Sequence, residues 1–357
     1  MGEHEVRPYA GGEETAGGVA KRGRVEGGMA SAMKPNAAGK FLVGVDIGGT
    51  NVRAGLVDRA GRLIADARRP ARALEGPPAT LAMVAEAVRE AIEKGGAKVA
   101  DVCGIGMGVP GRHNSRAGIC LFSPNFTGWV EVQVVEPIAK EFGLAAYMLN
   151  DVKTATLGEH RFGAGKGFDH VVMITLGTGI GCGVISDGQL RLGSGEGFSE
   201  AGHMCIDVNG PLCTCGSRGC WEALAGRDAI IRMAIFQMQS GQETLLAEYD
   251  EVTPAAIAEA AQKGDALAQS VMRHLALYVG VGVSNLIQLY NPQVIIIGGG
   301  IAQAGEILFE PIQRVVNARA HMVPASTCEI RPAALGDDAG IIGGAVLVLR
   351  EMEKQAQ

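Results

Sequence analysis

Residues 41–58 read FLVGVDIGGTNVRAGLVD, two apolar segments separated by a pair of glycines. The first segment, FLVGVD, is typical of a buried strand that ends at a turn. NVRAGLVD and, after a turn at Asp58–Gly61, RLIADARRP predict two further strands. We therefore expect the folded part of the chain to open at Phe41 with three strands in succession.

Helical patterns and further strands alternate after this opening. The first cycle continues with a helical pattern over residues 78–95, then VCGIGMGVP as a strand, VQVVEPIAKEF as a helix and AAYML as a strand. A second cycle opens with HVVMITLG and GCGVISDG as a hairpin around TGI, and QVIIIGGG is its last strand. Its helical patterns cover residues 226–239, 254–290, 302–319 and 339–353. The alternation predicts an α/β fold with helices on both faces of its sheets, in two related halves.

Composition argues against several classes of partner. The 357 residues carry a formal net charge of −6, which argues against binding to nucleic acid or to an anionic membrane. No segment approaches the roughly twenty apolar residues that span a bilayer. Eight cysteines, mostly in apolar segments, and no apolar signal segment favour a reducing cytoplasm. Residues 1–40 contain nine glycines and no Leu or Ile, so we expect a disordered tail.

Three glycine turns follow predicted strands. DIGGTNVR (46–53) and LGTGIGCG (176–183) both place glycines and a threonine in a turn between two strands, and IIIGGG (295–300) ends a third strand. Glycines permit positive φ and let backbone N–H groups approach a bulky anion closely. Asp46, at the end of the first strand, could hold Mg²⁺ through water. A single turn of this kind is more often a plain hairpin, but three of them favour a nucleotide.

Asn150 and Asp151 stand where the apolar strand AAYML ends and a helical pattern starts. Taken alone, the pair is best interpreted as a helix cap, because Asn and Asp side chains accept the free N–H groups of a first turn. A carboxylate at that place could also act as a base, and its surroundings have to decide between the two.

The segment EAGHMCIDVNGPLCTCGSRGCWE (200–222) contains the most specific motif of the chain. Its spacing is H-x9-C-x-C-x4-C, formed by His203, Cys213, Cys215 and Cys220. One imidazole and three thiolates match a closed, tetrahedral Zn²⁺ site of the structural kind. Redox-active cysteines are the alternative, but the segment lacks a C-x-x-C pair. Cys205 is a weaker candidate ligand.

Taken together, these motifs resemble the ROK kinases, the bacterial sugar kinases and sugar-responsive repressors. The resemblance runs from about Phe41 to the C-terminal helix and rests on DIGGTNVR, GVPG (108–111), LND (149–151), LGTGIGCG, EAGHM, CTCGSRGCWE and IIIGGG, in family order. It implies a hexokinase/actin-like (ribonuclease H-like) fold of two domains, with the active site in the cleft between them. The implied small domain is residues 41–151 plus the helix 340–357. The large domain is residues 152–339 with the zinc loop 203–220.

The resemblance also assigns roles to residues. Asp151 would be the catalytic base, and the helix N-terminus would favour its anionic form. Sugar hydroxyls would be bound by Asn125, Asn150, Glu200, His203 and Glu222. The nucleotide and its Mg²⁺ would be held by Asp46, Gly48, Gly49, Thr50, Asn51, Gly177, Thr178, Gly179 and Gly299. His203 would present one ring nitrogen to zinc and the other to the sugar.

The function implied is transfer of phosphate from Mg-ATP to the 6-hydroxyl of glucose by a cytoplasmic homodimer. Kinases for fructose, mannose or N-acetyl amino sugars remain alternatives, as does polyphosphate as the donor. A sugar-sensing repressor is a second class, although residues 1–40 lack the apolar periodicity of a helix-turn-helix domain. A zinc-stabilised interaction module without catalysis would leave the glycine turns unexplained.

Overall fold

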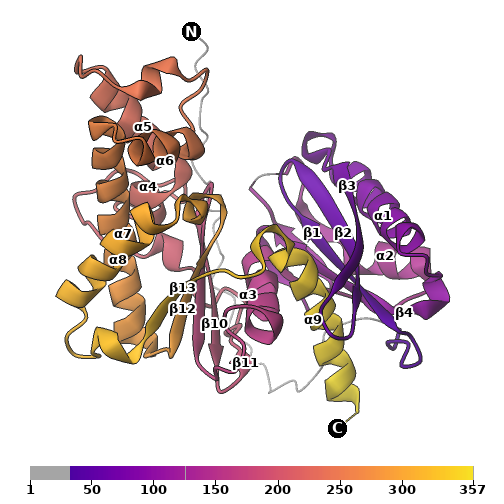
Figure 1. The fold of residues 1–357 in the computed structure, drawn as a ribbon. Coiled ribbons are helices and arrows are strands. Elements are labelled where there is room, and N and C mark those ends of the chain that lie inside the picture. Colours follow the sequence, from indigo (N-terminus) through magenta and orange to yellow (C-terminus); the bar gives the residue numbers. More distant parts are fainter. Residues whose placement is uncertain (1–32, 125, 357) are drawn as a thin grey trace, which may run out of the picture.

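The computed structural model describes residues 33–124 and 126–356 (Figure 1). Most of the predicted disordered tail and the predicted sugar ligand Asn125 lie outside the described residues. The expected tail boundary at residue 40 is too late. Asn36 N–H donates to the carbonyl of Cys103 and Lys40 N–H donates to the carbonyl of Asp101, both at 2.8 Å. The backbone before Phe41 is therefore already paired with the first sheet.

The first half of the chain forms a five-stranded sheet in the order β3-β2-β1-β4-β8. The three opening strands are antiparallel neighbours, as the sequence predicts, and β1, β4 and β8 run parallel. The bounds are β1 Phe41–Ile47, β2 Asn51–Asp58, β3 Leu63–Pro70, β4 Val102–Val109 and β8 Ala146–Asn150. Helices α1 (Pro77–Lys94) and α2 (Val135–Phe142) share one apolar core with this sheet.

The second half repeats the arrangement in a sheet of order β11-β10-β9-β12-β13. When the strands of each five-stranded sheet are counted in chain order, both sheets have the order third, second, first, fourth, fifth, so the expectation of two related halves is confirmed at the level of topology. The strands are β9 Val171–Leu176, β10 Ile180–Ser186, β11 Gln189–Leu190, β12 Val294–Gly298 and β13 Glu329–Pro332. The helices are α4 Trp221–Ala225, α5 Arg227–Met238, α6 Pro254–Gln262, α7 Ala266–Tyr290 and α8 Glu306–Arg319.

Helices α3 (Asp151–Phe162) and α9 (Ala339–Gln355) lie between the two sheets (Figure 1). Their apolar side chains share a core with residues of both sheets, including Leu42 of β1 and Val171 of β9. Helix α9 approaches the first sheet so closely that a Cβ at Gly44 would lie 1.7 Å from the carbonyl oxygen of Ile341. Only glycine fits there, so the C-terminal helix packs directly on β1.

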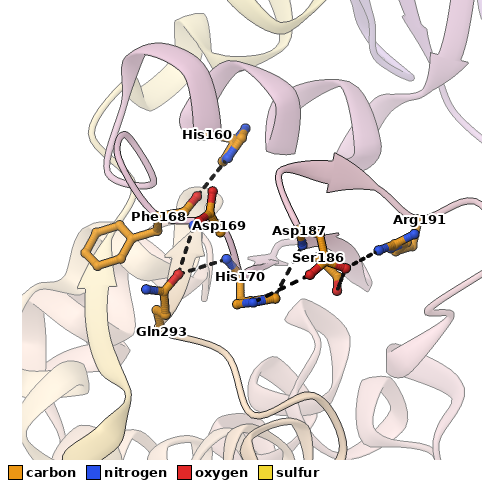
Figure 2. A network of polar contacts seen from close by, with 8 residues as sticks. All are labelled: His160, Phe168, Asp169, His170, Ser186, Asp187, Arg191 and Gln293. Atoms are coloured by element: carbon orange, nitrogen blue, oxygen red, sulfur yellow. Dashed lines mark hydrogen bonds and ion pairs between the residues drawn. The ribbon is translucent and has the colours of Figure 1, made fainter.

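The far end of α3 is tied to the second sheet by polar contacts (Figure 2). His160 Nε2 lies 2.9 Å from the carbonyl oxygen of Phe168. Gln293 Oε1 accepts hydrogen bonds from the backbone N–H groups of Asp169 and His170, at 2.8 and 3.0 Å. These contacts stand at the starts of β9 and β12, away from the glycine turns at the strand ends. They fix α3 to the second sheet without entering the candidate site.

Several elements differ from the sequence-based expectation. The single helix expected over residues 254–290 is two helices, because Asp265 caps a new helix by accepting the N–H of Ala268 at 2.7 Å. The helix expected over 132–142 starts at Val135, and a short 3₁₀ segment covers Gly300–Ala304 before α8. A small sheet of β5 (Arg112–Asn114), β6 (Ile119–Phe122) and β7 (Val130–Gln133), and the edge strand β13, have no counterpart in the prediction. These strands have three or four residues, too few for a periodic signal.

Within residues 33–124 and 126–356, no helix combines the length and the apolarity required to span a membrane.

Candidate active site

A cavity of about 940 Å³ opens between the two halves, at the carboxyl ends of the central strands. Three of the predicted site residues line it, namely Asp46 from β1, Asp151 from α3 and Gly299 after β12. The other predicted nucleotide residues are not among its lining residues, namely Gly48, Gly49, Thr50, Asn51, Gly177, Thr178 and Gly179. Their neighbours Arg53 and Thr175 do line it, so the cavity is bordered by the strands that carry the glycine turns.

Of the two reasons expected for glycine in these turns, positive φ does not apply to the predicted phosphate turns, whereas room for close approach does. Gly299 has a φ of +87°, but none of the predicted phosphate-turn glycines has a positive φ. At Gly49 and Gly177 a Cβ would meet no atom within 4 Å and would point into open space. At these two positions the missing side chain leaves room beside the backbone, which is what close approach of a phosphate requires.

Two carboxylates meet in the cavity. Burial, and then the negative charge of Asp151, raises the pKa of Asp46 to about 6. Burial also raises the pKa of Asp151, the N–H of Val152 acts in the opposite direction, and nearby Glu200 raises it further. The sequence argument expected the helix N-terminus to dominate, but burial outweighs it. A divalent cation would relieve this repulsion, and oxygen ligands suit Mg²⁺, so the residues fit the expected metal.

Arg53 is a cavity residue to which the sequence analysis assigned no role. Its guanidinium donates to the Asp338 carboxylate and to the carbonyl of Asp337, both at 2.7 Å, and lies 3.5 Å from Asp66. Asp337 and Asp338 precede α9, so the contact joins β2 to the segment that connects the second sheet with α9. Only the tertiary structure brings these residues together, because 284 positions separate Arg53 from Asp337.

Asn150 and Asp151 make different contacts at the start of α3. Asn150 is the cap of α3, and its Oδ1 accepts the N–H groups of Val152 at 3.1 Å and Lys153 at 3.3 Å. Asp151 is the first helical residue, and its Oδ1 also accepts the N–H of Val152, at 3.0 Å. Because Asn150 performs the capping, the second carboxylate oxygen of Asp151 is left for chemistry at the cavity.

Glu200 lies near the start of α3, where its negative charge contributes to the raised pKa of Asp151. Its carboxylate is 3.8 Å from the ammonium of Lys153, two residues after Asp151 in the first turn of the helix. The Glu200 side chain is 60% exposed, so it remains accessible to a ligand. The structure thus places three of the predicted site residues, Asn150, Asp151 and Glu200, around the start of α3.

The four predicted zinc ligands form one cluster. The donor atoms of His203, Cys213, Cys215 and Cys220 all lie within 4.8 Å of one another. The Sγ atoms of Cys215 and Cys220 are 3.7 Å apart, and Cys213 Sγ is 3.7 Å from His203 Nδ1. Tetrahedral zinc with Zn–S bonds of about 2.3 Å requires S···S edges of about 3.8 Å, so the residues fit this metal. Cys205, the weaker candidate, lies outside the cluster.

The zinc loop is joined to the second glycine turn. Trp221, which follows Cys220 of the cluster, is fully buried in the core of the second half. Glu222 Oε2 accepts the N–H of Ile180 at 3.0 Å. A Cβ on Gly179 would lie 2.1 Å from the same oxygen, so a larger residue there would displace the Glu222 carboxylate. One oxygen of Glu222 therefore holds the glycine turn, a contact that the sequence analysis did not foresee.

Comparison with known proteins agrees with this geometry. The sequence model of the ROK family matches residues 42–351. A glucokinase of Thermotoga maritima is 37% identical over 86% of this chain and 96% of its own length. The crystal structure of a ROK family glucokinase from Streptomyces griseus in complex with glucose and AMPPNP superposes with a TM-score of 0.76 at 33% identity, covering 87% of this chain and 99% of that one.

A regulator is similar as well. The crystal structure of a ROK family transcriptional regulator, a homologue of the E. coli MLC protein, superposes with a TM-score of 0.81 at 28% identity. It covers 89% of this chain, whereas this chain covers 79% of the regulator.

Proposed function

The chain belongs to the ROK family, and we propose that it is an ATP-dependent glucokinase that phosphorylates the 6-hydroxyl of glucose. The observation that carries the proposal is the position of Asp151. It lies at the start of α3, lines the interdomain cavity and is near enough to Glu200 for that carboxylate to raise its pKa. A base beside a nucleotide-sized cavity and near a carboxylate that can bind hydroxyls is the arrangement that phosphoryl transfer to a sugar requires.

In the proposed reaction Asp151 accepts the proton of the sugar hydroxyl as its oxygen attacks the γ-phosphorus of ATP. The bond between that phosphorus and the β,γ-bridging oxygen breaks, and ADP leaves. Asn150, Glu200, His203 and Glu222 orient the sugar through its other hydroxyls. The transition state is loose, so positioning and charge stabilisation matter more than the strength of the base. A base with a raised pKa is adequate for this task.

Asp46 would hold Mg²⁺, through water, and the ion would neutralise charge on the phosphates. The four-ligand cluster would hold a structural zinc. His203 faces Cys213 of this cluster through Nδ1, so its Nε2 is available for a sugar hydroxyl. The glycine turns after β1 and β9 would lie along the phosphates, where Gly49 and Gly177 leave open space.

A sugar-responsive regulator is the second candidate, because such proteins share the fold. The retained Asp151, the carboxylate pair of the cavity and the near-complete coverage of glucokinase chains favour the kinase. Cytoplasmic location, a homodimer and the absence of a nucleic-acid partner remain predictions.

A coupled assay with a panel of hexoses tests the proposal directly. Purified protein with Mg-ATP is offered glucose, mannose, fructose and N-acetylmannosamine, and ADP release is followed for each. We expect the highest kcat/KM with glucose. A parallel series with polyphosphate in place of ATP identifies the donor. No turnover with any hexose would refute the kinase, and a preference for another sugar would correct the substrate.

Two substitutions at Glu222 separate its two contacts. Glu222→Gln keeps an oxygen for the Ile180 N–H but removes the charge that strengthens hydrogen bonds from sugar hydroxyls. Such bonds contribute about 1.5–3 kcal/mol, so KM for glucose should rise roughly ten- to a hundred-fold while KM for ATP changes little. Glu222→Ala also frees the glycine turn, and KM for ATP should then rise too. If Glu222→Gln has the same KM for glucose as the wild type and the same KM for ATP, Glu222 does not contact the sugar.

A further inference from the structure

The segment 193–200 reaches the sugar side of the site through a strained backbone. Glu196 and Ser199 have φ values of 59° and 65°, in the left-handed region that residues other than glycine rarely adopt. Such conformations persist only where surrounding contacts hold them, and they gather at functional sites. Glu200, a predicted sugar ligand, ends this segment. What holds the segment therefore also sets the position of that carboxylate.

A buried lysine makes the central contact. Lys153 of α3 is 3% exposed, and its Nζ donates to the carbonyl oxygen of Glu196 at 2.7 Å. The same ammonium is 3.8 Å from the Glu200 carboxylate. A buried charge costs free energy unless it is paired. The segment therefore stabilises the Lys153 ammonium, and the ammonium in turn stabilises the segment. The proposed reaction assigns it no chemical step.

Glu196 also connects the segment to the first half of the chain. Its Oε2 accepts the backbone N–H of Ser115 at 2.8 Å, in the turn between β5 and β6. The carbonyl and the carboxylate of one residue thus bind α3 and the small three-stranded sheet. Glu196 thus joins the two halves of the chain, as the contact of Arg53 with Asp338 does elsewhere.

We propose that Lys153 is a positioning residue for the sugar site, which fixes segment 193–200, and with it Glu200, relative to Asp151. We call the contacts of Lys153 with Glu196 and Glu200 the clamp. The contact of the Glu196 carboxylate with the N–H of Ser115, here called the strut, connects the clamp to the first half of the chain. Since Asp151 and Lys153 share the first turn of α3, the base and the sugar-binding carboxylate are held at a set separation. This inference rests on the proposed function.

Lys153→Met tests the clamp, because methionine fills a similar volume without charge or donor. With glucose and ATP varied separately, we expect KM for glucose to rise at least about tenfold and KM for ATP to stay within about twofold of wild type. Lys153→Arg keeps the charge and should restore part of the affinity for glucose. Lys140→Met, at a lysine of α2 whose side chain is 72% exposed, is the matched control and should behave as wild type.

Amide hydrogen exchange of the sugar-free protein gives a readout that does not depend on catalysis. In Lys153→Met, exchange should accelerate within residues 193–200 and stay unchanged in the zinc loop. Glu196→Ala keeps the backbone carbonyl, so it tests the strut even if Lys153→Met fails to fold, and it should also raise KM for glucose selectively. A wild type without hexokinase activity would refute the proposed function but leave the exchange result decisive. Unchanged exchange and unchanged KM for glucose in folded variants would overturn the clamp.

Discussion

Replacing Asp151 by Asn is expected to remove nearly all phosphoryl transfer while the fold and sugar binding are retained. Asn150 caps α3, so the helix does not depend on the Asp151 charge for its start. Asparagine has nearly the same shape and keeps an oxygen for the Val152 N–H. It cannot accept the hydroxyl proton, and a positioned general base contributes about 10²- to 10⁴-fold to the rate.

The measurement is kcat at saturating glucose and ATP, together with glucose affinity by calorimetry. Asp169→Asn is a suitable control, because that exposed aspartate lies before β9, at the sheet edge away from the site. A variant Asp151→Asn that kept a tenth or more of wild-type kcat would disprove the role of Asp151 as base. A variant that also lost glucose binding would instead indicate a wider disturbance of the site.

The zinc loop should produce the second large effect. Freshly purified protein should contain one zinc per chain, and Cys215→Ser should lose most of it. Zinc binding would stabilise the folded loop, so its loss lowers the free energy of unfolding. A decrease of a few kcal/mol corresponds to a fall in Tm of roughly 5–10 °C. Because His203 is one of the four clustered residues and Glu222 follows Cys220 by two residues, glucose binding should be lost along with the metal.

Elemental analysis, a melting curve and glucose titration check this result. Cys205→Ser is the matched control, since Cys205 is an exposed cysteine of the same loop outside the four-ligand cluster. It should keep zinc, Tm and glucose affinity. Protein that contains no zinc when freshly purified would refute the metal site, whatever the behaviour of the variants.

The second sheet and its glycine turn illustrate how far local sequence patterns reach. The apolar segments of β9 and β12 are buried strands with glycines at their ends, as predicted. Their physical signals are contained within about ten residues, so the sequence alone can express them. The break between α6 and α7 was missed although Gly264 and Asp265 mark it, because continuous apolar periodicity on both sides outweighed a single capping residue.

By itself, the sequence determined the α/β alternation, the repeat of the two halves, the Asn–Asp junction and the cluster of one histidine and three cysteines. Each is a short-range pattern of apolar spacing, capping or metal-ligand spacing. Only the tertiary structure decided that burial raises the pKa of Asp151, that Glu222 holds the turn at Ile180, and that Lys153 and Ser115 both bind Glu196. These contacts join residues that are 42 positions apart for Glu222 and Ile180, 43 for Lys153 and Glu196, and 81 for Ser115 and Glu196. Burial and the electric field at a site depend on which distant segments pack around it, and no local pattern encodes that.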